Sequence, residues 1–419
     1  MYMEIRRAIY LDKLIRKKKN GLIKVITGVR RCGKSYLLFY LFHKHLLDSG
    51  VPENHIIEVA LDDRSNKALR DPDAMLRFIK ENIRDKEDYY IILDEVQYLN
   101  EFEDVLNSLL HIRNADVYVT GSNSKFLSSD VITQFRGRGD EIHVYPLSFS
   151  EYVPAYQGSM DEAWDDYLIY GGMPLILTMA EPEDKAAYLN SLFQKVYISD
   201  IVERHDVRNK VELDELVDIL ASAIGSYTNQ SKLVRTFKSV KGKTISDKTI
   251  KNYIDYLIDS FLISKAVRYD IKGKKYIGSP SKYYFEDVGL RNARLGFRQV
   301  EQTHLMENII YNELRIRGYH VDVGVVEYYG VNGEGKRGKK QLEVDFVATK
   351  GSEKHYIQSA FTLPTADKVD QEQRSLLHIP DSFRKIVVVG DNIKVRRDEN
   401  GIITIGLRNF LLDEDSLRL

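Results

Sequence analysis

The stretch KVITGVRRCGKSYLLFYL, residues 24–41, decides the fold. An apolar run is followed by two glycines with four residues between them, then by a lysine and a serine, so residues 28–35 match GxxxxGK[ST]. Glycines let backbone N–H groups converge on a phosphate, and the next helix adds its positive N-terminus. The stretch therefore predicts an α/β fold with a phosphate-binding loop between a buried strand and a helix.

The loop pattern also assigns roles to single residues. Lys34 is expected to reach the β and γ phosphates of a nucleotide, and Ser35 is expected to hold Mg²⁺. ATP and Mg²⁺ are thus the predicted ligand and cofactor. The predicted nucleotide-binding residues are the loop and its next neighbour: Gly28, Val29, Arg30, Arg31, Cys32, Gly33, Lys34, Ser35 and Tyr36.

A second motif lies about sixty residues further on, where the apolar run YYIILD is followed by a glutamate. Asp94 is predicted to complete the magnesium shell, and Glu95 to polarise an attacking water. The alternative is an ordinary strand end. Because a phosphotransferase must exclude water, a base for water favours hydrolysis over transfer to a small molecule.

Polar and basic residues follow the next apolar run. The segment TGSN ends with Ser122 and Asn123, either of which is placed to sense a γ phosphate, although a simple turn is the alternative. Arg136 and Arg138 are candidates for an arginine that stabilises transition-state charge. A surface loop rich in arginine explains them nearly as well.

Short apolar runs alternate with helical patterns between residues 21 and 147. Runs buried on both faces, with helices between them, indicate a parallel sheet covered on two sides. We assign residues 1–165 to this core, with helices at 34–46, 72–83 and 102–113. The predicted strands are LIKVIT, HIIEVAL, YYIILDE, DVYVTGS and EIHVYPL.

Residues 166–299 change to helical patterns and become basic. The range 231–282 carries 13 Lys and Arg against 4 Asp and Glu. Its order of helix, turn, helix and basic hairpin predicts a winged helix, with Lys248 and Lys251 on the recognition helix. Double-stranded DNA is therefore a predicted partner, with an ATPase lid or a protein contact as the alternative role.

Residues 300–419 form a third predicted unit, a small α/β domain. A helical pattern at 304–319 comes first, and a second follows near 368–378. The strand-like runs are VDVGVVEYYG, LEVDFVAT, HYIQSAF and KIVVVG.

Composition places the chain among ordinary globular proteins. Of its 419 residues 43% are hydrophobic and 29% charged, and the formal net charge is -1. The single cysteine, Cys32, excludes an intrachain disulfide and a cysteine metal cluster. No apolar leader and no run of eighteen apolar residues occurs, so we expect a cytoplasmic protein without a membrane anchor.

Five segments in order carry a family resemblance: GVRRCGKS, ILDEVQYL, VTGSNSKFL, FRGR followed by YPLSFSEYV, and DYLIYGGMPLIL. Together they resemble the bacterial and archaeal AAA-type P-loop ATPases, close to the STAND group, whose carboxy-terminal part belongs to a family of unknown function. The resemblance implies an AAA+/ASCE P-loop NTPase core, followed by a helical lid and a winged helix. It also implies that Pro174 lies beside adenine and that the catalytic residues are Glu95, Lys34, Asn123 and Arg138.

The third unit resembles the PD-(D/E)XK nuclease fold. By this resemblance Glu307, Asp345 and Gln358 match metal-binding positions, but Ala360 stands where an active enzyme has lysine. The resemblance therefore implies an inactive, nuclease-like scaffold. Lys354 is the residue able to supply an amine from a shifted position.

The sequence supports a Mg²⁺-dependent ATPase that acts as a nucleotide-driven switch or remodelling factor, on DNA or on a protein client. The alternatives are an ATP-regulated DNA-binding protein and a metal-dependent nuclease. A further alternative, signalling or defence through assembly into a homo-oligomer, is suggested by the STAND likeness alone, as an analogy at the level of the fold.

Overall fold

The computed structural model describes residues 4–121, 137–242, 244–331 and 337–418. It divides into two compact units. Unit 1 is Met1–Pro146 with Asp259–Phe261, and unit 2 is Leu147–Ile258 with Leu262–Leu419.

Unit 1 is built on a five-stranded sheet in which every neighbouring pair is parallel. The strand order is β2-β3-β4-β1-β5, so β4 lies between the strand before the glycine loop and the strand that ends in Asp94. The prediction of a parallel sheet is confirmed. The strands are β1 (Ile23–Thr27), β2 (Ile56–Ala60), β3 (Tyr89–Asp94), β4 (Ala115–Thr120) and β5 (Gly139–His143).

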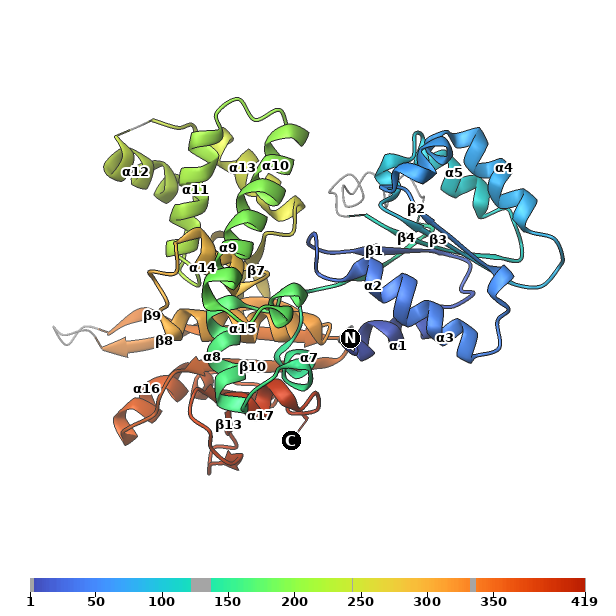
Figure 1. The fold of residues 1–419 in the computed structure, drawn as a ribbon. Helices are drawn as coiled ribbons and strands as arrows, with labels where there is room; N and C mark the ends of the chain where they lie inside the picture. Colours follow the sequence, from blue (N-terminus) through green and yellow to red (C-terminus); the bar gives the residue numbers. More distant parts are fainter. Residues whose placement is uncertain (1–3, 122–136, 243, 332–336, 419) are drawn as a thin grey trace. The chain divides into compact units, whose positions relative to one another are not determined.

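Helices cover both faces of this sheet (Figure 1). Apolar side chains of α4 and α5 pack with one face in a buried cluster that includes Val25, Ile91 and Leu106. On the other face the Phe42 ring lies 4.7 Å from that of Tyr118. The helices are α1 (Ala8–Arg16), α2 (Lys34–Tyr36), the π-helix η1 (Leu37–Phe42), α3 (His43–Asp48), α4 (Pro72–Asn82) and α5 (Phe102–Leu109), with 3₁₀ turns η2 (Glu53–His55), η3 (Arg64–Arg70) and η4 (Val96–Tyr98).

Unit 2 begins with a helical region. Ser148 and Ser159 each form a capping box, with Glu151 and Glu162 respectively, which fixes where two of its helices start. The elements are α7 (Phe149–Tyr152), η6 (Val153–Ala155), α8 (Met160–Tyr170), η7 (Pro174–Thr178), α9 (Pro182–Ser191), the π-helix η8 (Leu192–Ile198), α10 (Ser199–Arg204), α11 (Lys210–Ser222), α12 (Gln230–Lys241), α13 (Asp247–Asp259) and α14 (Val288–Arg294).

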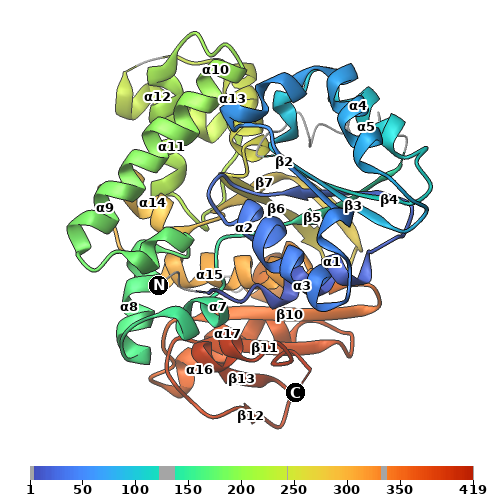
Figure 2. The ribbon, with the colours of Figure 1, turned by 45° about the vertical axis from the view of Figure 1, so that its right-hand side comes forward.

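The rest of unit 2 is a mixed eight-stranded sheet in the order β12-β13-β11-β10-β9-β8-β6-β7. Helices α15 and α16 lie on its opposite faces (Figures 1 and 2). Its elements are β6 (Ile263–Asp270), β7 (Lys275–Phe285), α15 (Gln302–Ile316), β8 (His320–Val331), β9 (Arg337–Lys350), β10 (Glu353–Ala360), α16 (Ala366–Leu377), β11 (Arg384–Val389), β12 (Arg396–Arg397), β13 (Ile403–Gly406) and α17 (Leu407–Leu412).

The hairpin β6–β7 belongs to this sheet. Strand β6 pairs in parallel with β8, with Arg268 opposite Val323. The hairpin expected as the wing of a winged helix therefore continues the sheet across residue 299. The boundaries at 165 and 299 stay predictions, as does the winged helix.

No helix within the described ranges is both long and apolar enough to span a membrane.

Candidate nucleotide site

The glycine loop leaves the carboxyl end of β1 and enters a helical run, α2, η1 and α3, that continues from Lys34 to Asp48. Gly28 and Gly33 have φ of 135° and 100°, which L side chains rarely adopt. A Cβ on Gly28 would lie 2.1 Å from the Val144 carbonyl oxygen. The loop thus needs glycine at this position for space as well as for conformation.

The ammonium group of Lys34 lies inside the loop. Its Nζ donates to the carbonyl oxygens of Gly28 and Val29, each at 3.0 Å, and the side chain is buried. The Cys32 thiol, also buried, donates to the Val144 carbonyl at 3.2 Å. The two bonds made by Lys34 hold its ammonium group against the backbone of the glycine loop.

Asp94 joins the two sequence motifs. Its Oδ2 accepts a hydrogen bond of 2.7 Å from the Ser35 hydroxyl, and its Oδ1 accepts one from the Thr120 hydroxyl. Burial raises the pKa of this carboxyl, and the two hydroxyl bonds oppose the rise. Within the described part of the chain Asp94 forms no ion pair. Mg²⁺ prefers hard oxygen ligands, and the oxygens of Asp94 and Ser35 are of this kind. No basic side chain among the described residues competes with a metal ion for Asp94.

Glu95 follows Asp94 in a left-handed conformation, with φ of 51°. Its backbone N–H donates to the Thr120 hydroxyl at 2.9 Å, and its carboxylate accepts a hydrogen bond from the Gln97 amide. Thr120 therefore ties both acidic residues to the end of β4. Thr120 begins the polar segment TGSN, from which a phosphate sensor was predicted, but its bonds to the two acidic residues were not predicted.

An amino-terminal arm supports the loop, and the sequence reading missed it too. The Arg7 guanidinium, which is buried, donates to the Cys32 carbonyl at 3.0 Å and to the Tyr145 carbonyl at 2.5 Å. The backbone N–H of Tyr145 donates to the Tyr10 hydroxyl at 3.2 Å. Nothing in the short basic sequence around residue 7 distinguishes this arginine from its exposed neighbours.

The remaining predicted residues lie apart from this centre or outside the described ranges. The Arg138 carbonyl accepts the Ile23 N–H at 2.9 Å, which places Arg138 at the amino edge of the sheet, opposite the glycine loop. Pro174 begins η7 in unit 2. The Tyr36 hydroxyl accepts the Ile5 N–H at 3.3 Å. Ser122, Asn123 and Arg136 lie outside the described residues.

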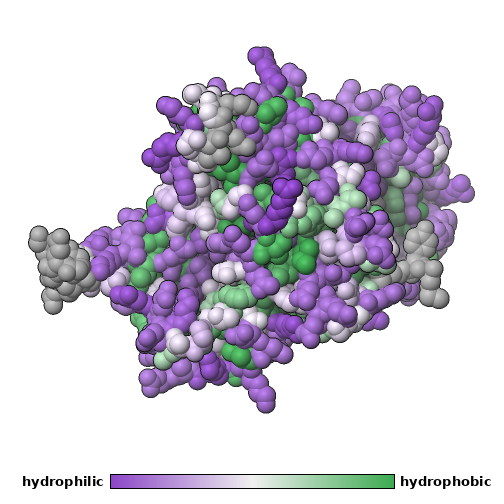
Figure 3. All heavy atoms as spheres, turned by 60° about the vertical axis from the view of Figure 1, so that its left-hand side comes forward, coloured by the Kyte–Doolittle hydropathy of each residue, from purple (hydrophilic) through white to green (hydrophobic). Residues whose placement is uncertain are grey.

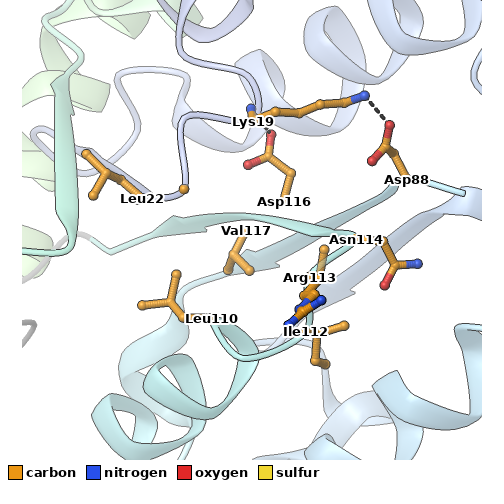
Figure 4. Close-up of a pocket in the computed structure, with 11 residues that line it drawn as sticks. Lys19, Leu22, Asp88, Leu110, Ile112, Arg113, Asn114, Asp116 and Val117 are labelled. Atoms are coloured by element: carbon orange, nitrogen blue, oxygen red, sulfur yellow. Dashed lines mark hydrogen bonds and ion pairs between the residues drawn. The ribbon is translucent and has the colours of Figure 1, made fainter. Parts of the chain in front are cut away.

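A separate cavity of about 200 Å³ lies at the same amino edge of the unit 1 sheet (Figure 4). Lys19 forms an ion pair with Asp88 there, and its backbone N–H donates to Asp116 at 3.0 Å. Asp116 also pairs with Lys24, which is fully buried. Since these charges pair with one another, we do not assign the nucleotide to this cavity.

The residues expected to bind metal in unit 2 lie near one another, but with an unforeseen lysine. Glu307 forms an ion pair with Lys282 at 2.8 Å, and Lys282 lies 4.0 Å from Asp345. Lys354 is elsewhere, with its Nζ 5.1 Å from the centre of the Phe383 ring. Across the described residues, no group of three or more His, Cys, Asp or Glu is arranged to hold a metal ion.

Two family models match successive parts of the chain. Residues 20–153 match a family described as "AAA domain", and residues 161–301 match a "Domain of unknown function (DUF8612)". Over 414 residues the chain is 33% identical to an uncharacterized protein of Haemophilus influenzae, covering 97% of this chain and 98% of that protein. The chain belongs to this family of AAA-domain proteins.

The AAA-domain protein also has an archaeal relative. The uncharacterized protein MJ1544 of Methanocaldococcus jannaschii is 28% identical over 389 residues, which are 89% of this chain and 81% of the relative. Among solved structures, the Aeropyrum pernix ORC1 protein in complex with DNA gives a TM-score of 0.28 at 13% identity, covering 70% of this chain and 93% of that one. So low a score supports no inference about the AAA-domain protein.

Proposed function

We propose that this AAA-domain protein binds ATP with Mg²⁺ and hydrolyses it, and that it works as a nucleotide-driven switch or remodelling factor. The observation that carries the proposal is the 2.7 Å hydrogen bond between the Ser35 hydroxyl and Asp94. It joins the glycine-loop motif and the acidic motif, 59 residues apart, at one edge of a parallel sheet. Two independent motifs that converge in space are much stronger support than either one alone.

The residues present fit the nucleotide and its metal. Gly28 to Tyr36 would hold the phosphates, and Lys34 would exchange its bonds to loop carbonyls for bonds to phosphate oxygens. Ser35 and Asp94 would hold Mg²⁺, which neutralises phosphate charge when bound. The order of the sheet, with β4 between β1 and β3, further supports the additional-strand class of P-loop ATPases.

The proposal of hydrolysis depends on Glu95 and on the hydrogen bonds that hold it. The glutamate follows the metal-binding position directly, and the Thr120 hydroxyl fixes its backbone at 2.9 Å. A carboxylate held there would orient water and accept its proton. Asn123 remains the proposed sensor of the γ phosphate. Arg138 sits at the opposite edge of the sheet, so we propose that it serves the site of a neighbouring copy in a homo-oligomer.

Calorimetry with ATP and Mg²⁺ tests the binding step. Intact wild-type protein should bind, and Lys34→Ala should bind about 10–100-fold more weakly, because charge-assisted hydrogen bonds to phosphate contribute about 1.5–3 kcal/mol. Lys44→Ala is the matched control, since this lysine is exposed on α3. Absence of heat with folded wild-type protein would end the proposal.

The other parts of the chain have proposed roles of their own. We assign residues 1–165 to the ATPase core, 166–299 to a helical lid and winged helix with Pro174 near the base, and 300–419 to a nuclease-like domain. A cytoplasmic location and a protein client stay part of the same proposal.

A second candidate function is ATP-regulated binding to double-stranded DNA. Lys248 and Lys251 are exposed one turn apart on α13, and Lys232, Arg235 and Lys238 are exposed on α12. Figure 3 displays mainly hydrophilic side chains around α12. One charge of the basic segment is unavailable, however, because Lys282 is buried in ion pairs.

Salt dependence tests this second function. Each phosphate contact contributes about 0.9 to the slope of log affinity against log salt. The double change Lys248→Ala with Lys251→Ala should therefore lower the slope by about 2. The pair Lys80→Ala with Lys86→Ala, exposed lysines of unit 1, is the control of equal charge. An affinity for duplex DNA that does not change with salt concentration would exclude this second function.

A further inference from the structure

Unit 2 contains three carboxylates around one buried ammonium group, and two of them, Glu307 and Asp345, are buried, whereas the Glu343 side chain is 33% exposed. Lys282 Nζ, from β7, lies 2.8 Å from Glu307 Oε1 of α15 and 2.6 Å from Glu343 Oε1 of β9. Asp345 Oδ1, two residues further along β9, is 4.0 Å away. Lys282 is 4% exposed and Asp345 8% exposed. The lysine thus sits among acidic groups that come from two other elements.

Three further polar groups hydrogen-bond to the cluster or to its neighbours. Tyr284 donates its hydroxyl to Glu307 Oε1 at 2.6 Å, and the Ser359 N–H donates to Asp345 Oδ2 at 2.8 Å. Gln358, expected as a metal ligand, uses its Oε1 to accept the Asp345 backbone N–H at 3.4 Å. These bonds orient the oxygen atoms, but they leave the negative charge of the carboxylates to be balanced by a cation.

The segment at residues 225–228 covers the cluster. A Cβ on Gly225 would lie 3.1 Å from Glu307 Oε2, so this backbone passes directly over the carboxylate. The Tyr227 ring centre is 5.6 Å from Lys282 Nζ. Thr228 and Ser281 exchange two backbone hydrogen bonds of 2.9 Å, which fix the segment to β7. A phosphodiester therefore has no open approach to the cluster from this side.

Carboxylates that approach one another in a buried site need a cation, because their repulsion is weakly screened there. A divalent metal is one solution, and a lysine amine is the other. Here the amine contacts Glu307 and Glu343 directly, at distances where a metal ion would have to displace it. We propose that Lys282 is a built-in counter-ion, which holds the place of a divalent cation and makes the cluster a metal-independent tie between β7, α15 and β9.

The test compares Mn²⁺ binding in full-length variants, measured by electron paramagnetic resonance without nucleotide. Wild-type and Asp345→Asn chains should bind Mn²⁺ identically, since neither has a free site in unit 2. Lys282→Met should gain a site, and adding Asp345→Asn to it should weaken that site by at least about tenfold. Lys354→Met, a lysine outside the cluster, is the matched control and should gain nothing.

Two results would overturn the proposal. The first is Mn²⁺ binding by the wild-type chain that Asp345→Asn abolishes, or Mg²⁺-dependent DNA cleavage with the same dependence. The second is a folded Lys282→Met chain that gains no site. If Lys282→Met fails to fold, the comparison of wild type with Asp345→Asn still decides, because it needs no lysine variant.

Discussion

The two units each bury carboxylates, but they balance the negative charge in different ways. In unit 1 Asp94 has the hydroxyls of Ser35 and Thr120 as partners. In unit 2 Glu307 has the ammonium of Lys282 at 2.8 Å. Hydroxyls orient a carboxylate without cancelling its charge, so the first site favours a cation from outside. The second site carries its own cation.

The difference shows that acidic residues brought close together by a fold do not by themselves make a metal site. What matters is whether a basic side chain reaches them in the folded chain. Lys282 lies 25 residues before Glu307 and 63 before Asp345, and only the pairing of β6 with β8 brings its hairpin into the same sheet. Variants at four residues, Glu95, Lys282, Asp287 and Arg7, test this difference between the two units.

The largest effect is expected at Glu95 in unit 1, the unit whose acidic site needs a bound metal ion. Glu95→Gln should lower the rate of phosphate release about 10²–10⁴-fold, because a general base is lost. Affinity for ATP, measured by calorimetry, should stay near the wild-type value. Glu101→Gln, an exposed neighbour, is the control. Equal phosphate release by both variants would contradict the role.

The next effect concerns the internal cation. Lys282→Met should lower the free energy of unfolding by about 3–5 kcal/mol, because it leaves buried carboxylates without their partner. Adding Glu307→Gln should recover part of this loss, since the neutral amide removes the charge that was left unpaired. Denaturant titration of four chains, wild type, the two single variants and the double variant, measures both changes. If the double variant loses more free energy of unfolding than the two single variants together, Lys282 does not act as the counter-ion of Glu307.

Asp287 sharpens the comparison with a third kind of partner, the backbone amide. It accepts N–H bonds from Gly172 at 2.7 Å and Leu290 at 2.9 Å, and burial raises its pKa from 3.8 to about 6, although these bonds oppose the rise. The folded chain then binds this proton more tightly than the unfolded chain. The stabilisation is complete below about pH 4 and is lost as the pH rises through about 6.

The measurement compares wild type with Asp287→Asn in thermal unfolding from pH 4 to pH 7. The stability advantage of wild type should shrink by about 2 kcal/mol over this window. Asp255→Asn, an exposed carboxylate on α13, should show no such trend. An advantage that grows with pH would mean that the ionised form of Asp287 is the stabilised one.

The smallest effect is expected at Arg7, a buried cation that donates to carbonyl oxygens of the loop region. Arg7→Met should raise the Kd for ATP about tenfold, because a charge-assisted hydrogen bond contributes about 1.5–3 kcal/mol to holding the loop. Arg6→Met, exposed in the same arm, should leave the Kd unchanged. If both variants bind alike, Arg7 only packs the arm.

Much of unit 1 was predictable because its signals are local. Short apolar runs predict β1 to β5. The motif GxxxxGK[ST] predicts the loop, because its glycine spacing is local to eight residues. The roles of Thr120 and Arg7 were not predicted, because their partners lie at least 25 residues away in the chain. Also not predicted were α14, β12, β13 and α17, since elements of two to seven residues show too little periodicity to detect.

By itself, the sequence determined the parallel core, the glycine loop and the acidic pair, since each depends on neighbours within a few residues. Only the tertiary structure decided which side chains meet: that Ser35 reaches Asp94, that Arg138 stands at the far edge of the sheet, and that Lys282 sits among the carboxylates. The physical reason is that ion pairs and hydrogen bonds act over a few ångströms in space. A chain's order along the backbone does not specify those distances until its strands have paired.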